Sequence, residues 1–423
     1  SAEAMEANES TAMISILFIL LAIAFGIAVY RKNAPLSVAT VAGVIGIVAI
    51  VAIGLNWHPL ALSYNAWMVI VGLYILVASV TPVWILLQPR DYLSSFLLYF
   101  MMAVSVIGII GAAIMGHSQL DIPAFNGFSH PVSNGLFTTG SIFPALFVTI
   151  ACGAISGFHS LVASGTTAKQ LDSEKDARAI GYGSMLIECA LAVVSLCAVG
   201  FVWAGASAET SEYASPTAVF AKGISGMIGT FTGSDSQAVN VAYNMLVLAV
   251  SVFCLTSLDT ATRLARYMFQ EFWLEPGETY KTAKGYKKIL THPVVSTAIT
   301  VVLGIGLGMT GYTKIWPLFG AANQLLAAVG LMAVCTWLGA MGRNNKMFYI
   351  PMMFMLIVTV CSLFQTMVAK VKTITAGGAD TGWAVVQAGI AFLLIVLAVV
   401  LAVISIRTII GQNKSDLEAV NQD

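Results

Sequence analysis

Long apolar runs separated by polar connections constrain this sequence more than any other feature. About 18 or more consecutive apolar residues can cross a bilayer as a helix. Charged residues make up only 9% of the 423 residues, whereas a soluble domain carries roughly 25%. We count eleven such runs, at 12–30, 37–56, 66–88, 93–116, 141–163, 180–203, 238–258, 294–311, 318–341, 347–368 and 382–405. The sequence therefore predicts an all-α polytopic membrane protein with eleven transmembrane helices.

The polar connections between these runs predict the organisation of the chain. We expect four transmembrane helices over 1–116, followed by an extracytoplasmic loop over 117–140. An interrupted helix and a second helix, which carries Glu188, follow over 141–203, and a second extracytoplasmic loop covers 204–237. The region 238–405 holds five transmembrane helices and, between the first two, a cytoplasmic amphipathic segment at 270–290; a cytoplasmic tail covers 406–423.

The lysine and arginine positions predict which side each connection faces. If residues 1–10 lie outside, 16 of the 20 basic residues fall inside. The four exceptions are Lys222, Lys314, Lys370 and Lys372. Cytoplasmic loops carry an excess of lysine and arginine, so this asymmetry favours an outer N-terminus and a cytoplasmic C-terminus.

The stretch "ACGAISGFHSLVASGTTAKQ" at 151–170 interrupts an apolar run with glycine, histidine and hydroxyl residues. Non-helical backbone at membrane depth is tolerated only where protein or a wet cavity surrounds it. We therefore expect a helix break that lines a substrate cavity. The candidate residues are Gly153, Gly157, His159, Ser160, Ser164 and Thr166. The alternative is a packing face of small residues, which is common in membrane helices.

Glu188 is a carboxylate inside an apolar run, about two helical turns from its predicted cytoplasmic end. A charged side chain inside a membrane helix costs at least ~2.5 kcal/mol, which makes ion or proton handling the default hypothesis. We assign Glu188 to the coupling ion. The alternative is a hydrogen-bonded structural glutamate.

Two further stretches carry polar residues near the predicted cytoplasmic face. In "TSLDTATRLAR" (256–266), Asp259 and Arg263 are four residues apart, so one helical turn can hold an ion pair that forms a gate. The alternative is a salt-bridged helix end. In "TPVWILLQPRD" (81–91), Pro82 and Gln88 mark a helix break, while Trp84 and Arg90 fit an interfacial anchor.

Two amides, Asn323 and Gln324, stand early in the apolar run of "WPLFGAANQLLAA" at 316–328. Amide side chains in membrane helices form hydrogen bonds between helices. They can equally contact a substrate, and we include both as candidate substrate-binding residues.

Five long stretches resemble the carbon starvation protein A (CstA) family of bacterial inner-membrane transporters. They are "SVTPVWILLQPRDYLSSFL" (79–97), "IFPALFVTIACGAISGFHSLVASGTTAKQL" (142–171), "DARAIGYGSMLIE" (176–188), "SLDTATRLARYMFQE" (257–271) and "WPLFGAANQLLAAV" (316–329). The resemblance implies uptake of peptides or pyruvate under carbon starvation. It also implies a LeuT/APC-like inverted-repeat core, in which unwound helices hold the substrate near the bilayer midplane.

The N-terminal part of the family pattern has no counterpart here. Family members begin with further membrane segments that include a Gly-His-His-Phe motif, which this sequence lacks. We therefore expect the chain to correspond to a partial core without the family's N-terminal helices.

The leading functional hypothesis is a secondary active transporter that imports small peptides or pyruvate across the bacterial inner membrane. The expected partners are such a substrate and the lipid bilayer. Coupling to protons is favoured because His159 and Glu188 can exchange them, and sodium is the alternative. No cofactor, metal site or nucleic acid is expected, since no catalytic or nucleotide-binding motif is present. The alternatives are an intramembrane enzyme, a non-transporting sensor or structural subunit, and a truncated inactive transporter fragment.

Overall fold

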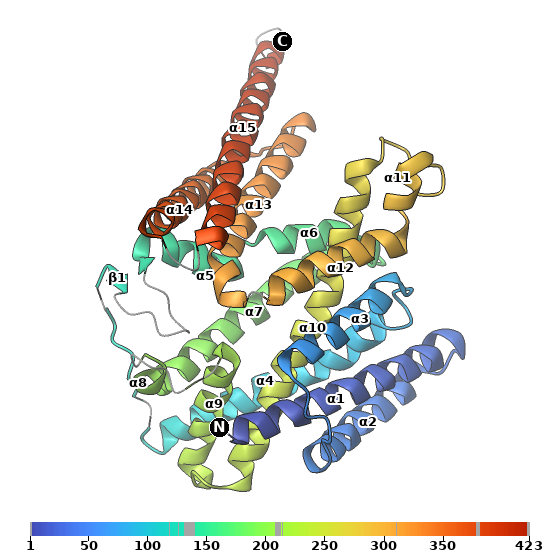
Figure 1. Ribbon diagram of the computed structural model, residues 1–423, viewed down its shortest axis with the longest axis vertical. Coiled ribbons are helices and arrows are strands. Elements are labelled where there is room, and N and C mark those ends of the chain that lie inside the picture. The colour runs from blue at the N-terminus through green and yellow to red at the C-terminus, as the bar shows by residue number, and fades with distance from the viewer. Residues whose placement is uncertain are drawn as a thin grey trace. The chain divides into compact units, whose positions relative to one another are not determined.

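The computed structural model describes residues 2–117, 119–125, 127–130, 140–207, 213, 215–309, 311–377 and 381–420. The chain divides into two compact units. Unit 1 comprises the described residues of 1–124 and 178–310, and unit 2 comprises those of 125–177 and 311–423. Each unit is helical (Figure 1).

Unit 1 is built around α4 and α10, which pack against each other and both pack against α1 and α9. Helix α10 also packs against α3 and α12. Its helices are α1 (Ala2–Gly26), α2 (Leu36–Asn56), α3 (Tyr64–Val80), α4 (Leu87–Ile114), α7 (Asp176–Phe201), α8 (Trp203–Ala206), α9 (Pro216–Thr232), α10 (Gln237–Trp273), α11 (Gly285–Leu290) and α12 (Pro293–Met309), with a π-helical turn at Ile27–Arg31.

Unit 2 centres on α13, which packs against α5, α6, α14 and α15. Its elements are the strands β1 (Ser129–His130) and β2 (Gly140–Ser141), a π-helical turn (Ile142–Leu146), α5 (Phe147–Ala154), α6 (Gly157–Gly165), short 3-10 turns at Thr167–Lys169 and Lys346–Phe348, α13 (Tyr312–Ala340), α14 (Tyr349–Ala376) and α15 (Thr381–Val420). The two strands pair antiparallel, with Ser129 opposite Ser141.

Within the described part of the chain, eight helices are long and apolar enough to cross a membrane. They are Glu9–Arg31, Leu36–Asn56, Leu87–Ile114, Asp176–Phe201, Gln237–Trp273, Leu318–Ala340, Lys346–Ala376 and Thr381–Gly411. Each coincides with one of the eleven apolar runs. Runs 66–88 and 294–311 become the 17-residue helices α3 and α12, and run 141–163 is interrupted. The structure thus supports a helical multi-pass membrane protein. It gives eight candidate spans in the described residues, where the sequence predicted eleven.

The faces of α2 show how such a helix divides its surface. Val38, Val41, Ile45 and Val48 recur at helical spacing and are all 62–65% exposed. On the opposite face Gly43 is buried, and a Cβ atom there would lie 2.7 Å from Leu93 Cδ2. Small residues permit close helix packing in lipid, whereas an exposed apolar stripe suits contact with acyl chains.

The connection 204–237 contains α9, a helix that the apolar-run count missed. Its buried residues include Ala221, Ile224 and Ile228, which lie three and four positions apart on one face. The Ser215 side chain accepts a hydrogen bond from Ala218 N at 3.3 Å at the start of the helix. Gly233 ends it with φ +95°. Small residues lower the hydropathy of this helix. Because its large apolar residues occupy one face, they form no continuous apolar run long enough to cross a membrane.

The predicted amphipathic segment 270–290 is not one continuous helix. Its first residues are the end of α10, which runs to Trp273. Turns follow, and the segment closes with the short helix α11. Gly277 adopts φ +86° within these turns, a backbone conformation that glycine adopts most readily. At the other end of the chain, α15 continues as helix into the predicted tail 406–423.

Candidate functional site

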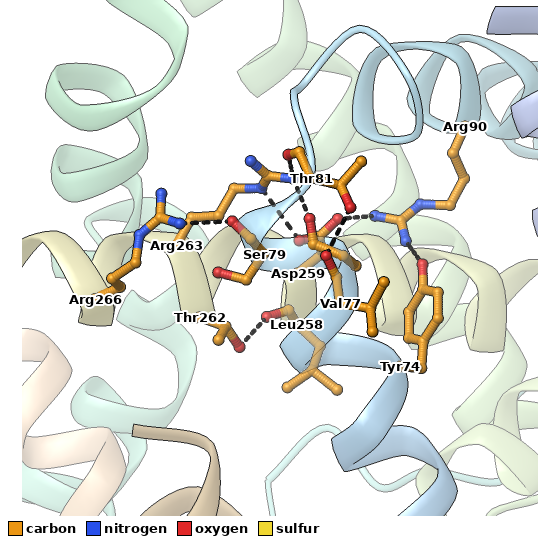
Figure 2. Close-up of polar contacts among 11 residues, drawn as sticks. Tyr74, Val77, Ser79, Thr81, Arg90, Leu258, Asp259, Thr262, Arg263 and Arg266 are labelled. Carbon is orange, nitrogen blue, oxygen red and sulfur yellow. Dashed lines mark hydrogen bonds and ion pairs between the residues drawn. The ribbon is translucent and has the colours of Figure 1, made fainter. Parts of the chain in front are cut away.

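A buried ion-pair network joins α3, α4 and α10 within unit 1 (Figure 2). Arg90 Nη2 lies 3.2 Å from Asp259 Oδ2, and Arg263 Nε lies 3.2 Å from Asp259 Oδ1. The side chains of Arg90 and Asp259 are fully buried. Arg90 also donates a hydrogen bond to the hydroxyl of Tyr74 on α3. We call Tyr74, Arg90, Asp259, Arg263 and Arg266 the Asp259 cluster.

The cluster also supplies hydrogen-bond donors to the free carbonyl groups at the end of α3. The last carbonyls of a helix have no partner within it and carry partial negative charge. Arg263 Nη2 donates to Ala78 O and, at 3.0 Å, to Thr81 O. Arg266 Nη1 donates to Ser79 O at 2.7 Å. These guanidinium groups therefore hold the α3 terminus against α10.

The charges explain why this arrangement is stable as a unit. Two arginines, Arg90 and Arg263, pair with the carboxylate of Asp259, while the carbonyl of Ser79 near the end of α3 accepts a hydrogen bond from Arg266. Removing one member of a buried ion pair leaves an uncompensated charge and costs several kcal/mol. The contacts of the cluster therefore depend on one another.

The sequence predicted only part of this cluster. The four-residue spacing of Asp259 and Arg263 indicated their ion pair, and the structure forms it. Arg90, which the sequence placed as an interfacial anchor, is instead a fully buried partner of Asp259. The Pro82 signal was informative, because α3 ends at Val80 and Pro82 lies exposed in the turns before α4. Gln88 lies in the first turn of α4.

Tyr74 gave no sequence signal, because a tyrosine in an apolar run also fits packing or the membrane interface. Its hydroxyl contact with Arg90 joins positions 16 residues apart that only the turn between α3 and α4 brings together.

Unit 2 contains a helix break within the stretch 151–165. Helix α5 ends at Ala154 and α6 begins at Gly157, so Ile155 and Ser156 separate them. Ser156 is extended, with φ −114° and ψ 135°. The interruption that the glycine pattern predicted is present, and it falls between Gly153 and Gly157.

The adjacent amides on α13 contact the two helix halves separately. Asn323 Oδ1 accepts a hydrogen bond from Phe158 N at 2.9 Å, and Asn323 Nδ2 donates to Ser156 Oγ at 3.1 Å. Gln324 Nε2 donates to Val148 O at 3.3 Å. Both amide side chains are buried. Side-chain hydrogen bonds thus replace part of the backbone bonding that the break removes.

Gly157 allows this contact because it lies against the backbone of α13. A Cβ atom at Gly157 would lie 2.8 Å from Ala327 N and would also overlap Asn323 O and Leu326 Cβ. The packing role, which the sequence left open as an alternative, is therefore present at Gly157. Gly153 lies in α5 and is exposed.

The remaining candidates of the stretch 151–170 lie on or beside α6. Ser160 Oγ donates to Gly157 O at 2.7 Å, and Ser164 Oγ donates to Ser160 O at 2.9 Å, so both hydroxyls bond within α6. His159 is exposed, and Thr166 follows the last residue of α6. Their contact with a substrate stays a prediction.

Glu188 lies half-buried on α7 of unit 1. Its assignment to a coupling ion stays a prediction. In the part of the chain that the structure describes, no three histidine, cysteine, aspartate or glutamate residues are grouped closely enough to hold a metal ion.

We predict that Gly157→Ala destabilises the protein by about 1–3 kcal/mol, because backbone atoms of α13 cannot rotate away from the added methyl group. Denaturant titration in detergent measures this change. Gly320→Ala is the matched control, since its Cβ would meet only Val148 Cγ1 at 3.4 Å, an ordinary contact distance. Equal stability of the two variants would contradict the close contact at Gly157.

We predict that Asp259→Asn lowers the free energy of unfolding by about 3–5 kcal/mol, because it removes the anion that two buried arginines share. The same titration measures it. Asp235→Asn makes the same chemical change at an exposed position and should leave stability unchanged. A loss at Asp259 no larger than at Asp235 would show that the ion pairs do not form.

Comparisons with known proteins fit this architecture. The chain matches the sequence model of the family described as "Carbon starvation protein CstA" over residues 1–212 and 203–362. It is 34% identical to "Peptide transporter CstA" of Helicobacter pylori (strain ATCC 700392 / 26695) over 330 residues, 66% of this chain and 46% of the relative.

Two other relatives show a similar degree of identity. "Peptide transporter CstA" of Bacillus subtilis (strain 168) is 31% identical over 353 residues, 75% of this chain and 57% of the relative. "Pyruvate/proton symporter BtsT" of Escherichia coli (strain K12) is 30% identical over 361 residues, 69% of this chain and 49% of the relative.

The chain spans about half the length of the curated relatives it matches. No solved structure shows significant similarity to it. The family match covers most of the sequence and includes both the Asp259 cluster and the α5–α6 break. The chain belongs to the carbon starvation protein CstA family.

Proposed function

We propose that this chain forms the core of a secondary active transporter that imports small peptides or small carboxylates such as pyruvate. Membership of the CstA family and the eight candidate membrane spans support this proposal. The relatives named as peptide transporters and as a pyruvate/proton symporter suggest the two substrate classes. We also propose a role in carbon starvation and a place in the bacterial inner membrane, which the family membership supports.

The observation that carries the proposal is the α5–α6 break. The break creates a C-terminus at α5 and an N-terminus at α6, where helices leave backbone groups without partners in their own helix. Asn323 of α13 accepts a hydrogen bond from one of these groups, Phe158 N. A helix C-terminus attracts a cation and a helix N-terminus attracts an anion. A zwitterionic peptide offers both charges, and pyruvate offers a carboxylate for the α6 end.

We also propose roles for the residues near the break. Asn323 and Gln324 orient the two helix halves and exchange hydrogen bonds with the substrate when the halves move. The other residues that we assign to the substrate site are Gly153, Gly157, His159, Ser160, Ser164 and Thr166.

We assign gating to the Asp259 cluster. The end of α3 is held by Arg263 and Arg266, while Arg90 links α4 to the same carboxylate. Opening requires the α3 carbonyls and the arginines to find new partners together, which favours two discrete states over gradual bending. Pro82 and Gln88 belong to the turn region where α3 would pivot.

We assign ion coupling to Glu188, with the proton as the coupling ion and sodium as the alternative. The name of the E. coli relative, a pyruvate/proton symporter, favours the proton. We further propose a LeuT/APC-like arrangement in which the interrupted run 141–163 and the shorter helices α3 and α12 complete eleven membrane segments. The N-terminus then faces the outside and the C-terminus the cytoplasm, as the basic residues indicate.

A non-transporting sensor or structural subunit, or a transport-incompetent fragment, is the competing proposal. It predicts binding without movement of the substrate. Counterflow in proteoliposomes separates the two, because it requires the site to open to each side in turn.

We predict that the purified chain in proteoliposomes exchanges labelled dipeptide or pyruvate and accumulates it under an inward proton gradient. Glu188→Gln should abolish accumulation and retain exchange, because the neutral amide cannot release a proton. Glu271→Gln, at an exposed position of α10, is the matched control and should behave as the unaltered chain.

Each outcome of this experiment decides one part of the proposal. Measurable binding without exchange would overturn transport by this chain. Unchanged accumulation in Glu188→Gln would overturn the coupling role of Glu188, while transport itself would stand.

A further inference from the structure

An exposed aromatic patch lies where α10 ends and α11 returns beside it in unit 1 (Figure 1). Phe272 is 78% exposed, Tyr286 63% and Ile289 64%. Large apolar side chains that gather on one exposed surface mark an interaction site more often than a random surface does.

Trp273 holds the patch together. Its ring meets Phe272 at 5.2 Å, Phe269 at 6.2 Å and Tyr286 at 6.3 Å between ring centroids, with steep angles between the ring planes. Such edge-to-face contacts stabilise aromatic pairs. The patch is therefore a formed surface that spans the two helices.

Lysines lie near the aromatic residues in sequence. Lys281, Lys284 and Lys288 are exposed. Lys287 instead pairs with Glu275, with 3.0 Å between Nζ and Oε1, and this hydrogen bond raises the pKa of Lys287. With Glu271, Glu275 and Glu278 included, residues 271–290 carry four lysines against three glutamates, a net charge of +1, and the three exposed lysines supply its excess of positive charge.

The position of the patch on α10 indicates what it meets. Helix α10 has 37 residues, and its length of about 55 Å exceeds the roughly 40–45 Å of a bilayer with its headgroups. Asp259, Arg263 and Arg266 of α10 are buried in the Asp259 cluster, whereas Glu271 in its last turn is exposed, as suits the end of a helix that leaves the hydrocarbon. Aromatic rings and lysines at such a helix end suit the headgroup layer.

We propose that this patch, formed by Phe272, Tyr286, Ile289, Lys281, Lys284 and Lys288, binds the anionic headgroups of the bilayer that the chain crosses. The lysines supply electrostatic attraction, and the rings and Ile289 enter the boundary between headgroups and acyl chains. The site is independent of the transport proposal, because it needs neither substrate nor gate.

Quenching of Trp273 fluorescence by brominated lipid tests this site. The full chain is reconstituted in phosphatidylcholine vesicles that contain an equal mole fraction of brominated phosphatidylglycerol or brominated phosphatidylcholine. The fluorescence of Trp273 is obtained as the fluorescence of the unaltered chain minus that of the variant Trp273→Phe. We expect the anionic lipid to quench this fluorescence more strongly, and high salt to remove the difference.

The variant Lys281→Gln, Lys284→Gln, Lys288→Gln should weaken the preference for the anionic lipid by about fivefold for each lysine removed. The matched control, Lys32→Gln, Lys346→Gln, Lys372→Gln, removes three exposed lysines elsewhere and should retain the preference. Equal quenching by the two lipids in the unaltered chain would overturn the proposal. So would an unchanged preference in the first variant, or an equal loss in the control.

Discussion

Backbone polar groups that are buried away from water need partners inside the protein, and this constraint governs both irregular regions described above. An unsatisfied N–H or C=O group in hydrocarbon costs several kcal/mol. In unit 1, arginines of α10 bond the carbonyls that α3 leaves free at its end. In unit 2, Asn323 of α13 bonds the first turn of α6. Within each unit, a long helix supplies the polar side chains that a shorter or broken helix requires.

The two solutions differ in chemistry, and the difference suits different tasks. Arginines around Asp259 form a charged network whose separation is costly, so it favours a closed state until all contacts exchange together. The amides of Asn323 and Gln324 are neutral, and each offers both a donor and an acceptor. Neutral hydrogen bonds are weaker and can exchange with a substrate one at a time. A charged gate and a neutral binding region therefore fit the proposed alternation between states.

Sequence reasoning found the features that depend on nearby residues. Apolar runs indicated all eight candidate spans, the glycines around Ser156 indicated the helix break, and the spacing of Asp259 and Arg263 indicated their ion pair. It missed what depends on tertiary contact. Arg90 lies 169 residues from Asp259 in sequence, and an arginine near a helix end also fits an interfacial anchor. Helix α9 escaped notice because its apolar residues occupy one face and form no continuous run.

Amide hydrogen exchange at the start of α6 tests the shared constraint most directly. We expect slow exchange of the Phe158 amide in the unaltered chain, because Asn323 Oδ1 accepts its hydrogen bond. Replacement of Asn323 by alanine should accelerate exchange in a peptide spanning 155–160 and leave peptides from α14 unchanged. Identical exchange at 155–160 in the two proteins would contradict the claim that side chains from the neighbouring helix satisfy the broken backbone.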